Sequence, residues 1–450
     1  MKRILVAIVS LVFILPGAGA QDVTPLSLKD CMDYAMKHNY SVKNAQIDVL
    51  IQQAQNNQTL SASMPHVNGK VDITDFDIAQ KSFIESGTFP IPGKTPVKGE
   101  VDAFSLSIPW TSSASFTASQ LIFDGSVFVA VKARNSVLEL ARLNGKITEE
   151  TVCYNVFKAY NSLVIAYRQY DIIKKSLVFA RSMQHDAEVL KESGFAEKLD
   201  VDRGNVQINN LATDSMRIAN MLDVSEQILK FQIGMELNKR IVLTDTAVND
   251  RKQTTMALVN EPEHYENVLT YNQLKLALKL NEYNLNRYQM SALPTLSAFW
   301  SFGYNNGYMK FKQLTLNNWL PSSIIGVSMS VPIFNGFMRK NQVTEAKLNI
   351  EKTKNNIEAV KQGIDFQVST SRTNLKNAIL QTQSQHRNLD LSNDVLELAQ
   401  KKYKAGVGSS MEVTQAQTEM LRAQNNYFSA LLDIINAEAD LKKALGLMKP

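Results

Sequence analysis

The sequence predicts a mainly α-helical chain with a membrane β-barrel portion, built as a duplicated repeat of a strand pair followed by long helices. Three observations predict this fold class: long stretches without proline, segments in which apolar and polar residues alternate, and an internal repeat. The chain has 450 residues, of which 44% are hydrophobic and 20% charged, and this composition excludes a disordered chain. The formal charge of +5 is small for this length and argues against a nucleic-acid-binding protein.

Residues 1–20 have the pattern of a signal peptide. Lys2 and Arg3 precede an apolar stretch, and Ala18-Gly19-Ala20 supplies the small residues of a cleavage site. The apolar stretch is too short for a membrane-spanning helix, so the alternative of an N-terminal anchor is the weaker one. We therefore expect an exported protein whose first twenty residues are removed. Gln21 follows the expected cleavage site, so no lipidated cysteine is expected there.

Proline is absent from residues 110–261 and again from 333–449. Because proline breaks helix interiors, its absence permits very long helices. Both stretches are rich in Ala, Leu, Lys, Gln and Glu, which are good helix formers, and apolar residues recur at steps of three and four. The predicted helices are about 126–192, about 198–234, about 337–404 and about 410–446. The two longest would each extend about 100 Å, as in coiled-coil-like assemblies.

Four other segments alternate with a period of two. From Phe104 to Ser119 the even positions are mostly apolar, whereas the odd positions are nearly all Ser or Thr. Such alternation is typical of an outer-membrane strand with a lipid face and a lumen face, and the alternative is a sandwich strand with one buried face. The small polar residues favour the membrane interpretation. The predicted strands are about 66–77, about 101–123, about 294–305 and about 322–334. The aromatic residues expected at the lipid interface are Phe104, Trp110, Trp300, Phe302, Tyr304 and Trp319.

The chain contains an internal duplication. The segment LIFDG at 121–125 matches PIFNG at 332–336, and each is expected to end a strand and open a long helix. Two further glycine pairs repeat at a separation of 212, namely Gly194 with Gly406 and Gly234 with Gly446. We therefore expect a first repeat over 21–234, a connecting equatorial segment over 235–262 and a second repeat over 263–450.

The duplication has two physical consequences. Four strands cannot close a membrane barrel, and an open sheet edge is not tolerated in lipid, so several copies must share one barrel. The shorter helices would flank the long ones. We expect the helix that ends near Gly234 to stack end to end with a helix running from about Tyr265 to Leu293.

These residues resemble the TolC-like outer-membrane efflux family. The resemblance rests on LIFDG and PIFNG, on Met-Pro at 64–65 and Leu-Pro at 293–294, and on the motif YKAGVG at 403–408. It extends in register over nearly the whole mature chain. It implies a homotrimer in the outer membrane, with a twelve-stranded barrel continued by a long periplasmic α-helical barrel. It also implies two protein partners, a periplasmic adaptor and an inner-membrane pump, besides the surrounding outer-membrane lipid.

The function implied by the resemblance is a passive exit duct of a tripartite efflux or type I secretion system. The alternative is a non-conducting, periplasm-spanning tether that a barrel anchors. Small polar residues on the strand interior favour conduction over a plug or tether. The cargo is selected upstream by the pump, so the sequence does not identify it.

The resemblance also implies roles for individual residues near the turns that follow the long helices. The expected adaptor-contact residues are Gly194, Phe195, Gly406 and Val407. The expected gate residues are Asp200, Glu412 and Tyr403, with Asp202 and Arg203 as alternatives. Gln415 stands where some family members have a second acid, which would weaken a charge-based gate. Acids near a helix start also favour the helix dipole, and this simpler explanation stays open for Asp200 and Glu412.

No residue pattern in the sequence predicts an enzyme. The five histidines lack metal-ligand spacing, and neither a zinc-protease motif nor a serine-hydrolase elbow is present. The segment 87–95 loosely resembles a phosphate loop, but Pro96 would block the helix that must follow. We therefore expect no catalytic residue, no cofactor and no metal site. Cys31 and Cys153 could form a disulfide or remain two buried thiols, and the second arrangement is favoured.

Overall fold

The computed structural model describes residues 24–78, 80–89, 93, 95–105, 108–244, 252–313 and 318–449. The expected signal peptide lies outside the described residues. The chain divides into two compact units, each built from separate segments of sequence. The sheet unit comprises 50–139 and 276–354, and the helical unit comprises the remainder. Among the described residues, no helix combines the length and the apolar character needed to cross a membrane.

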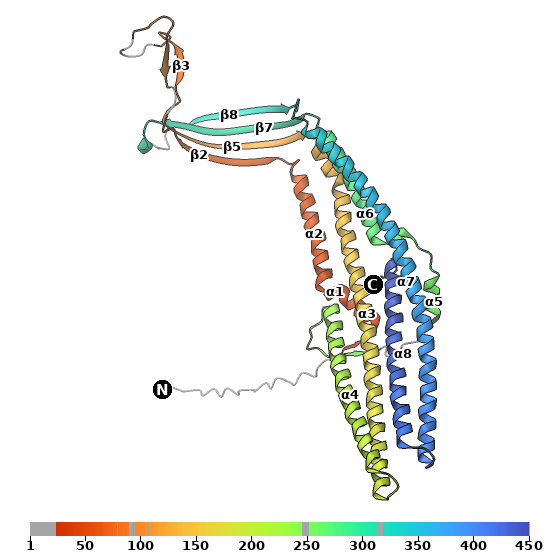
Figure 1. Ribbon diagram of the computed structural model, residues 1–450. Coiled ribbons are helices and arrows are strands. Elements are labelled where there is room, and N and C mark those ends of the chain that lie inside the picture. The colour runs from red at the N-terminus through yellow and green to blue at the C-terminus, as the bar shows by residue number, and fades with distance from the viewer. Residues whose placement is uncertain are drawn as a thin grey trace, which may run out of the picture. The chain divides into compact units, whose positions relative to one another are not determined.

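The sheet unit contains a four-stranded antiparallel sheet of order β2-β5-β7-β8 (Figure 1). Its strands are β2 at His66–Asp75, β5 at Trp110–Phe123, β7 at Thr295–Tyr308 and β8 at Leu320–Ser330. The strands therefore form two hairpins, one from each predicted repeat, and β5 pairs with β7 between them. Strands β2 and β8 lie at the two edges of the sheet.

The cross-strand register gathers the apolar residues on one face. Ala118 of β5 pairs with Val67 on one side and with Trp300 on the other, and Trp300 in turn pairs with Ile325. Successive side chains of a strand point to opposite faces, so Thr111, Ser113, Ser115, Thr117 and Ser119 of β5 lie together on the other face. The predicted alternation is confirmed, and the register brings the apolar faces of neighbouring strands together.

The strand predicted over about 101–123 is wrong as a single element. The structure has β4 at Val101–Phe104, which pairs with β3 at Ser82–Glu85 in a separate hairpin, and β5 begins only at Trp110. Pro109 has no amide N–H to continue a ladder, and its carbonyl oxygen accepts a hydrogen bond from the Phe76 N–H at 2.8 Å. Phe104 consequently lies in β4, outside the four-stranded sheet, and its role at the lipid interface stays a prediction.

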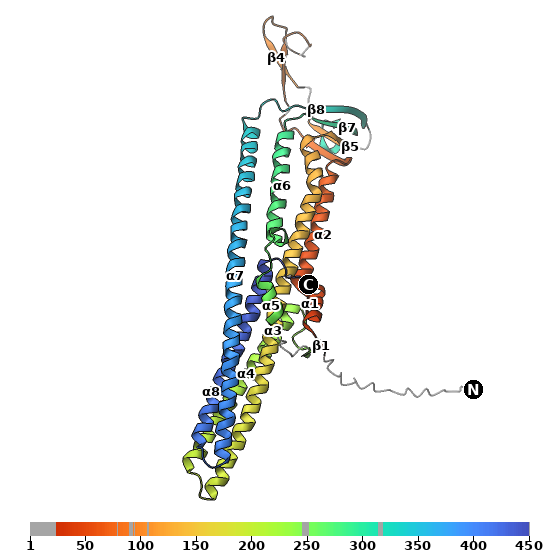
Figure 2. The same ribbon diagram turned by 90° about the vertical axis from the view of Figure 1, so that its right-hand side faces the viewer.

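The helical elements are long and follow the proline-free stretches. In chain order they are α1 at Leu28–His38, α2 at Tyr40–Ser61, α3 at Gly125–Glu192, α4 at Lys198–Ile233, α5 at Lys252–Val259, α6 at Leu269–Met290, α7 at Met338–Lys404 and α8 at Ser410–Ala444. Two short 3-10 helices, η1 at Tyr265–Asn267 and η2 at Phe311–Gln313, complete the set among the described residues. Within the helical unit α4 returns beside α3, and α8 returns beside α7 (Figures 1 and 2).

The core of the helical unit surrounds the middle of α3. Tyr160 and Leu163 of α3 are almost fully buried and pack with Leu229 of α4. Another face of α3 packs on α8, where Phe157 meets Phe428. The short strands β1 at Thr24–Leu26 and β6 at Ile241–Leu243 pair in parallel beside this core.

In the sheet unit, α2 packs beside α3, and the Asn56 amide donates to the Arg134 carbonyl at 2.8 Å (Figure 2).

The ends of α4 and α8 pack differently from the predicted end-to-end stacking of α4 on α6. Gly234, which follows α4, lies so close to the α1–α2 junction that an added Cβ would come within 2.6 Å of the His38 carbonyl oxygen. Gly446, which follows α8, makes the equivalent close approach to Asn267 just before α6. The two predicted repeats therefore correspond: α4 ends against the α1–α2 junction, and α8 ends against the residues just before α6.

Candidate functional site

The turn between α3 and α4 is built by a left-handed glycine. Gly194 has φ of +80°, which a residue with a side chain adopts only with strain. Its N–H donates to the Lys191 carbonyl at 3.0 Å, and the Phe195 N–H donates to the Leu190 carbonyl at 2.8 Å. These two bonds satisfy carbonyl groups that the helix end would otherwise leave unpaired. The turn therefore has a defined backbone that fixes the position of Phe195.

The turn between α7 and α8 repeats this construction. Gly406 has φ of +75°, and its N–H donates to the Tyr403 carbonyl at 3.0 Å. The Val407 N–H donates to the Lys402 carbonyl at 3.1 Å. The two connecting turns, 193–197 and 405–409, thus share a bonding pattern at the separation predicted from the sequence.

Each connecting turn presents an apolar side chain to solvent. Phe195 is 83% exposed and Val407 is 78% exposed. One turn further along, Leu199 and Met411 are also more than half exposed. Exposed apolar side chains at rigid, matching positions are typical of a protein contact surface. All four expected adaptor-contact residues lie in these turns.

Asp200 lies at the start of α4 and is bonded to the start of α8. The Ser410 hydroxyl donates to Asp200 Oδ1 at 2.6 Å, and an Arg203 guanidinium nitrogen lies 3.8 Å from the same oxygen. Asp200 also closes a capping box with Glu197, the residue that precedes α4. Helix capping and a cross-repeat link therefore coexist at one carboxylate. Sequence reasoning missed Ser410, although it lies beside the serine that caps α8.

Tyr403 is half-buried beside this carboxylate. Its ring packs against a small apolar cluster that includes Leu396 and Val413. Burial raises the pKa of Tyr403, and the nearby negative charges of Asp200 and Asp186 raise it further. Tyr403 therefore stays a neutral phenol at physiological pH. The structure thus brings together three of the expected gate residues, namely Asp200, Arg203 and Tyr403.

The other expected gate residues are not part of this arrangement. Glu412 is exposed in the first turn of α8, where its backbone N–H donates to the capping Ser409 hydroxyl at 3.2 Å. Asp202 is exposed on α4. Gln415 and Arg203 both line an open cavity of about 310 Å³. The position of Glu412 fits the simpler helix-start explanation as well as it fits a gate.

Three of the expected interfacial aromatics, Trp300, Phe302 and Tyr304, lie together on the apolar face of the sheet. The Phe302 ring centroid is 5.4 Å from that of Tyr304 and 6.4 Å from that of Trp300. The Trp300 Nε1–H donates to the Ser323 hydroxyl at 3.1 Å, so the indole N–H has a hydrogen-bond partner on this apolar face. Trp110 pairs with Tyr308 at the other end of β5, and Trp319 directly precedes β8.

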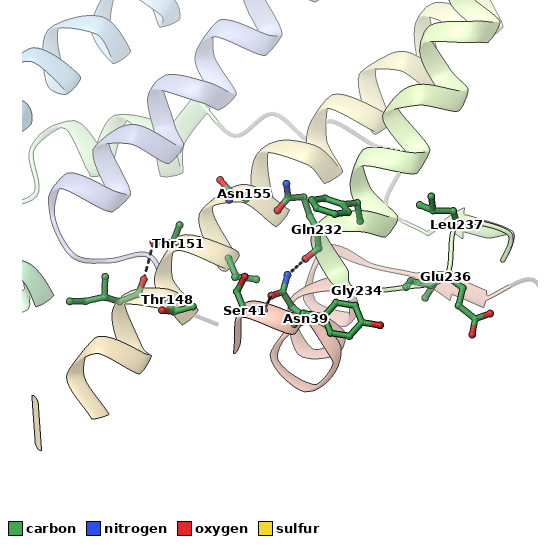
Figure 3. Close-up of a pocket in the computed structure, with 14 residues that line it drawn as sticks. Asn39, Ser41, Thr148, Thr151, Asn155, Gln232, Gly234, Glu236 and Leu237 are labelled. Atoms are coloured by element: carbon green, nitrogen blue, oxygen red, sulfur yellow. Dashed lines mark hydrogen bonds between the residues drawn. The ribbon is translucent and has the colours of Figure 1, made fainter. Parts of the chain in front are cut away.

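A cavity of about 430 Å³ lies where α4 ends against the α1–α2 junction (Figure 3). The Asn39 amide donates across it to the Gln232 carbonyl at 2.7 Å. Glu236 is the one carboxylate that lines it, and no nucleophile with an adjacent base is present among its described residues. The described residues also hold no group of three or more His, Cys, Asp or Glu that could bind a metal.

Known proteins share both the sequence signal and the fold. The family model described as outer membrane efflux protein matches residues 272–447. The outer membrane protein TolC of Escherichia coli (strain K12) is 22% identical over 348 residues, which cover 75% of this chain and 70% of that protein.

Solved structures are similar in fold to almost the whole of this chain. The outer membrane protein VceC from Vibrio cholerae has a TM-score of 0.68 at 14% identity, covering 93% of this chain and 96% of that one. The CmeC outer membrane channel of Campylobacter jejuni has a TM-score of 0.70 at 17% identity, covering 93% and 85%. These likenesses show the fold, and the family model and TolC supply the sequence relationship. Over residues 272–447 the chain therefore matches the outer membrane efflux protein family, and its likeness to TolC and to solved outer membrane channels extends well beyond that segment.

Proposed function

We propose that this chain forms the outer-membrane exit duct of a tripartite efflux or type I secretion system, and that it works as a passive homotrimer. Strands β2 and β8 lie at the edges of the four-stranded sheet, where each leaves one row of backbone groups unpaired. Lipid offers these groups no hydrogen-bond partner, so the sheet must be closed by other copies. Three copies would give twelve strands, an even number within the range of outer-membrane barrels.

The observation that carries the proposal is the division of the sheet into two faces. The apolar face carries exposed Phe116, Trp300 and Ile325, which suits contact with lipid. The opposite face of β5 carries Thr111, Ser113, Ser115, Thr117 and Ser119. Small polar side chains leave space for water, so this face is proposed to line the lumen.

The proposed partners are a periplasmic adaptor at the connecting turns and an inner-membrane pump that supplies the energy. Phe195 and Val407 offer the adaptor two matching apolar contacts on rigid turns. We also propose that 21–234 and 263–450 act as two repeats joined by 235–262, because the turns and the glycine contacts of the two halves correspond.

Two measurements test the proposal. Purified protein should assemble as a trimer and give stable single-channel currents in planar bilayers. Photo-crosslinking from Val407 in cells, followed by mass spectrometry, should capture an adaptor, and the pump found with it would identify the system. The alternative of a non-conducting tether requires a stable trimer without current. A conducting trimer that captures no adaptor would overturn the assignment to a tripartite system, but the chain would still be a channel.

A further inference from the structure

Phe299 is an exception on the Ser- and Thr-rich face of the sheet. It pairs with Ser119 of β5 on one side and with Gly326 of β8 on the other, so all three point to this face. A bulky aromatic ring on a face that lines a water-filled lumen would narrow the passage. Whether the passage is narrowed therefore depends on whether the ring projects from the sheet or lies against it.

The ring lies directly over Gly326. A Cβ built on Gly326 would come within 2.8 Å of Phe299 Cζ and 3.1 Å of Cε1, closer than side chains normally approach. Gly326 is absent from the residues with positive φ among those described, so its backbone conformation does not demand glycine. The missing side chain instead leaves the space that the ring occupies.

No other neighbour of Phe299 on this face offers the same space. Ser119 lies opposite Phe299 on β5, Ser297 and Ser301 lie before and after it along β7, and Ile324 and Ser328 flank Gly326 on β8. Each of these carries a side chain that would hold the ring away from the sheet. The corresponding pair in the first repeat is Lys70 with Ser115, so the aromatic–glycine pair is specific to the second repeat.

We propose that Phe299 and Gly326 set the bore of the duct at this level of the sheet. Gly326 lets the Phe299 ring lie over β8, which keeps three aromatic side chains from projecting into the lumen of the trimer. This inference rests on the proposed function, since it takes the Ser- and Thr-rich face as the lumen lining. It makes Phe299 and Gly326 determinants of which cargo sizes pass.

The experiment compares single-channel conductance of full-length trimers. Gly326→Ala should lower conductance, because the new methyl group displaces the ring from β8. Removing the ring in the double variant Phe299→Ala/Gly326→Ala should restore conductance to the wild-type level or above. Ser330→Thr adds a methyl group to the same face of the same strand, four residues from Gly326, and should leave conductance unchanged.

A second measurement does not depend on assembly of the Gly326 variant. In Phe299→Cys trimers, a benzyl-bearing thiosulfonate added after assembly should lower the current, because the extended adduct exceeds the space over Gly326. The wild-type trimer is the control, since Cys31 and Cys153 are buried. Unchanged conductance in Gly326→Ala, or an adduct without effect on current, would overturn the role of Phe299 and Gly326 in setting the bore. The proposed function as an exit duct would be unaffected. A wild-type trimer that carries no current would instead overturn the proposed function.

Discussion

The Ser410 hydroxyl donates a 2.6 Å hydrogen bond to Asp200 Oδ1 and so joins the first turns of α8 and α4. These two helices belong to different predicted repeats. Because the acceptor is charged and part-buried, the bond is stronger than a neutral surface contact. It is therefore a candidate for holding the connecting turns in one arrangement.

Loss of this bond should loosen the ends of the helices. We expect Ser410→Ala to increase the frequency of channel opening in planar bilayers, since a bond to a charged acceptor is worth about 1.5–3 kcal/mol net. Ser409→Ala is the matched control, because it removes the α8 cap at a cost of about 0.5–2 kcal/mol but leaves Asp200 bonded. Equal gating in both variants would show that the link between α4 and α8 does not hold the gate.

Glu412 should be less important to gating than Asp200. Its side chain is exposed in the first turn of α8, and no ion pair holds it among the described residues. Glu412→Gln should then change cation selectivity only if three copies approach one another around the pore axis. Bilayer recordings under a salt gradient measure this. An unchanged reversal potential would leave Glu412 as a helix-start residue.

The exposed apolar side chains of the turns should control adaptor docking without affecting the fold. Phe195→Asp places a charge where we expect an apolar contact, so adaptor crosslinking from Val407 should be lost. Phe195 is 83% exposed, so trimer yield and thermal unfolding should match wild type. Phe195→Leu should retain crosslinking. Normal capture by Phe195→Asp would place the docking surface elsewhere.

Two glycines with similar backbone angles should differ in their tolerance of alanine. Gly194→Ala meets open space and should cost only the left-handed strain, about 1–2 kcal/mol. Gly234→Ala carries the same strain and in addition forces a Cβ against the His38 backbone. We expect a clearly larger loss of thermal stability for Gly234→Ala. Similar melting temperatures would mean that the end of α4 can move away from the α1–α2 junction.

The faces of the sheet can be tested with one substitution on each. Ala114 lies on the apolar face, so Ala114→Arg should destabilise the membrane-inserted sheet by about 2–4 kcal/mol near the midplane. The neighbouring Ser113 lies on the opposite face, where Ser113→Arg should assemble and change conductance instead. Trimer yield from outer membranes measures both effects. Normal yield for Ala114→Arg would reverse the assignment of the faces.

The two cysteines should be unreactive in the folded protein. Both are free and buried, and burial raises the pKa of Cys31 to about 12 and that of Cys153 to about 11. At pH 8 both are therefore protonated, and mass spectrometry should find iodoacetamide adducts only after denaturation. Since both folded-state pKa values are raised, their stabilising contribution is complete below about pH 9 and is lost as the pH rises toward 11–12.

The pattern of residues within each segment of the sequence predicted most of the fold. The absence of proline predicted helices that the structure has at Gly125–Glu192 and Met338–Lys404. Alternation from Trp110 onward predicted which side chains share a face, because the two-residue period follows directly from strand geometry. The same pattern failed at Phe104, where alternation continued across Pro109 although the hydrogen-bond ladder did not.

The candidate site was predictable only in part. Glycine separations in the sequence located both connecting turns, because a left-handed helix end selects glycine locally. The partners of Asp200 could not be predicted in this way. The Ser410 hydroxyl reaches Asp200 across 210 residues of sequence, and no periodicity encodes that approach.

The sequence by itself determined the long helices and the two faces of the sheet, since each depends on geometry within one element, and repeated residue separations predicted the duplication. Only the tertiary structure decided that α4 ends against the α1–α2 junction instead of stacking on α6, and that Phe299 lies over Gly326. Both are close approaches between distant segments. A glycine in the sequence marks a place where backbone or ring can come near, but the packing of the whole chain decides which one does.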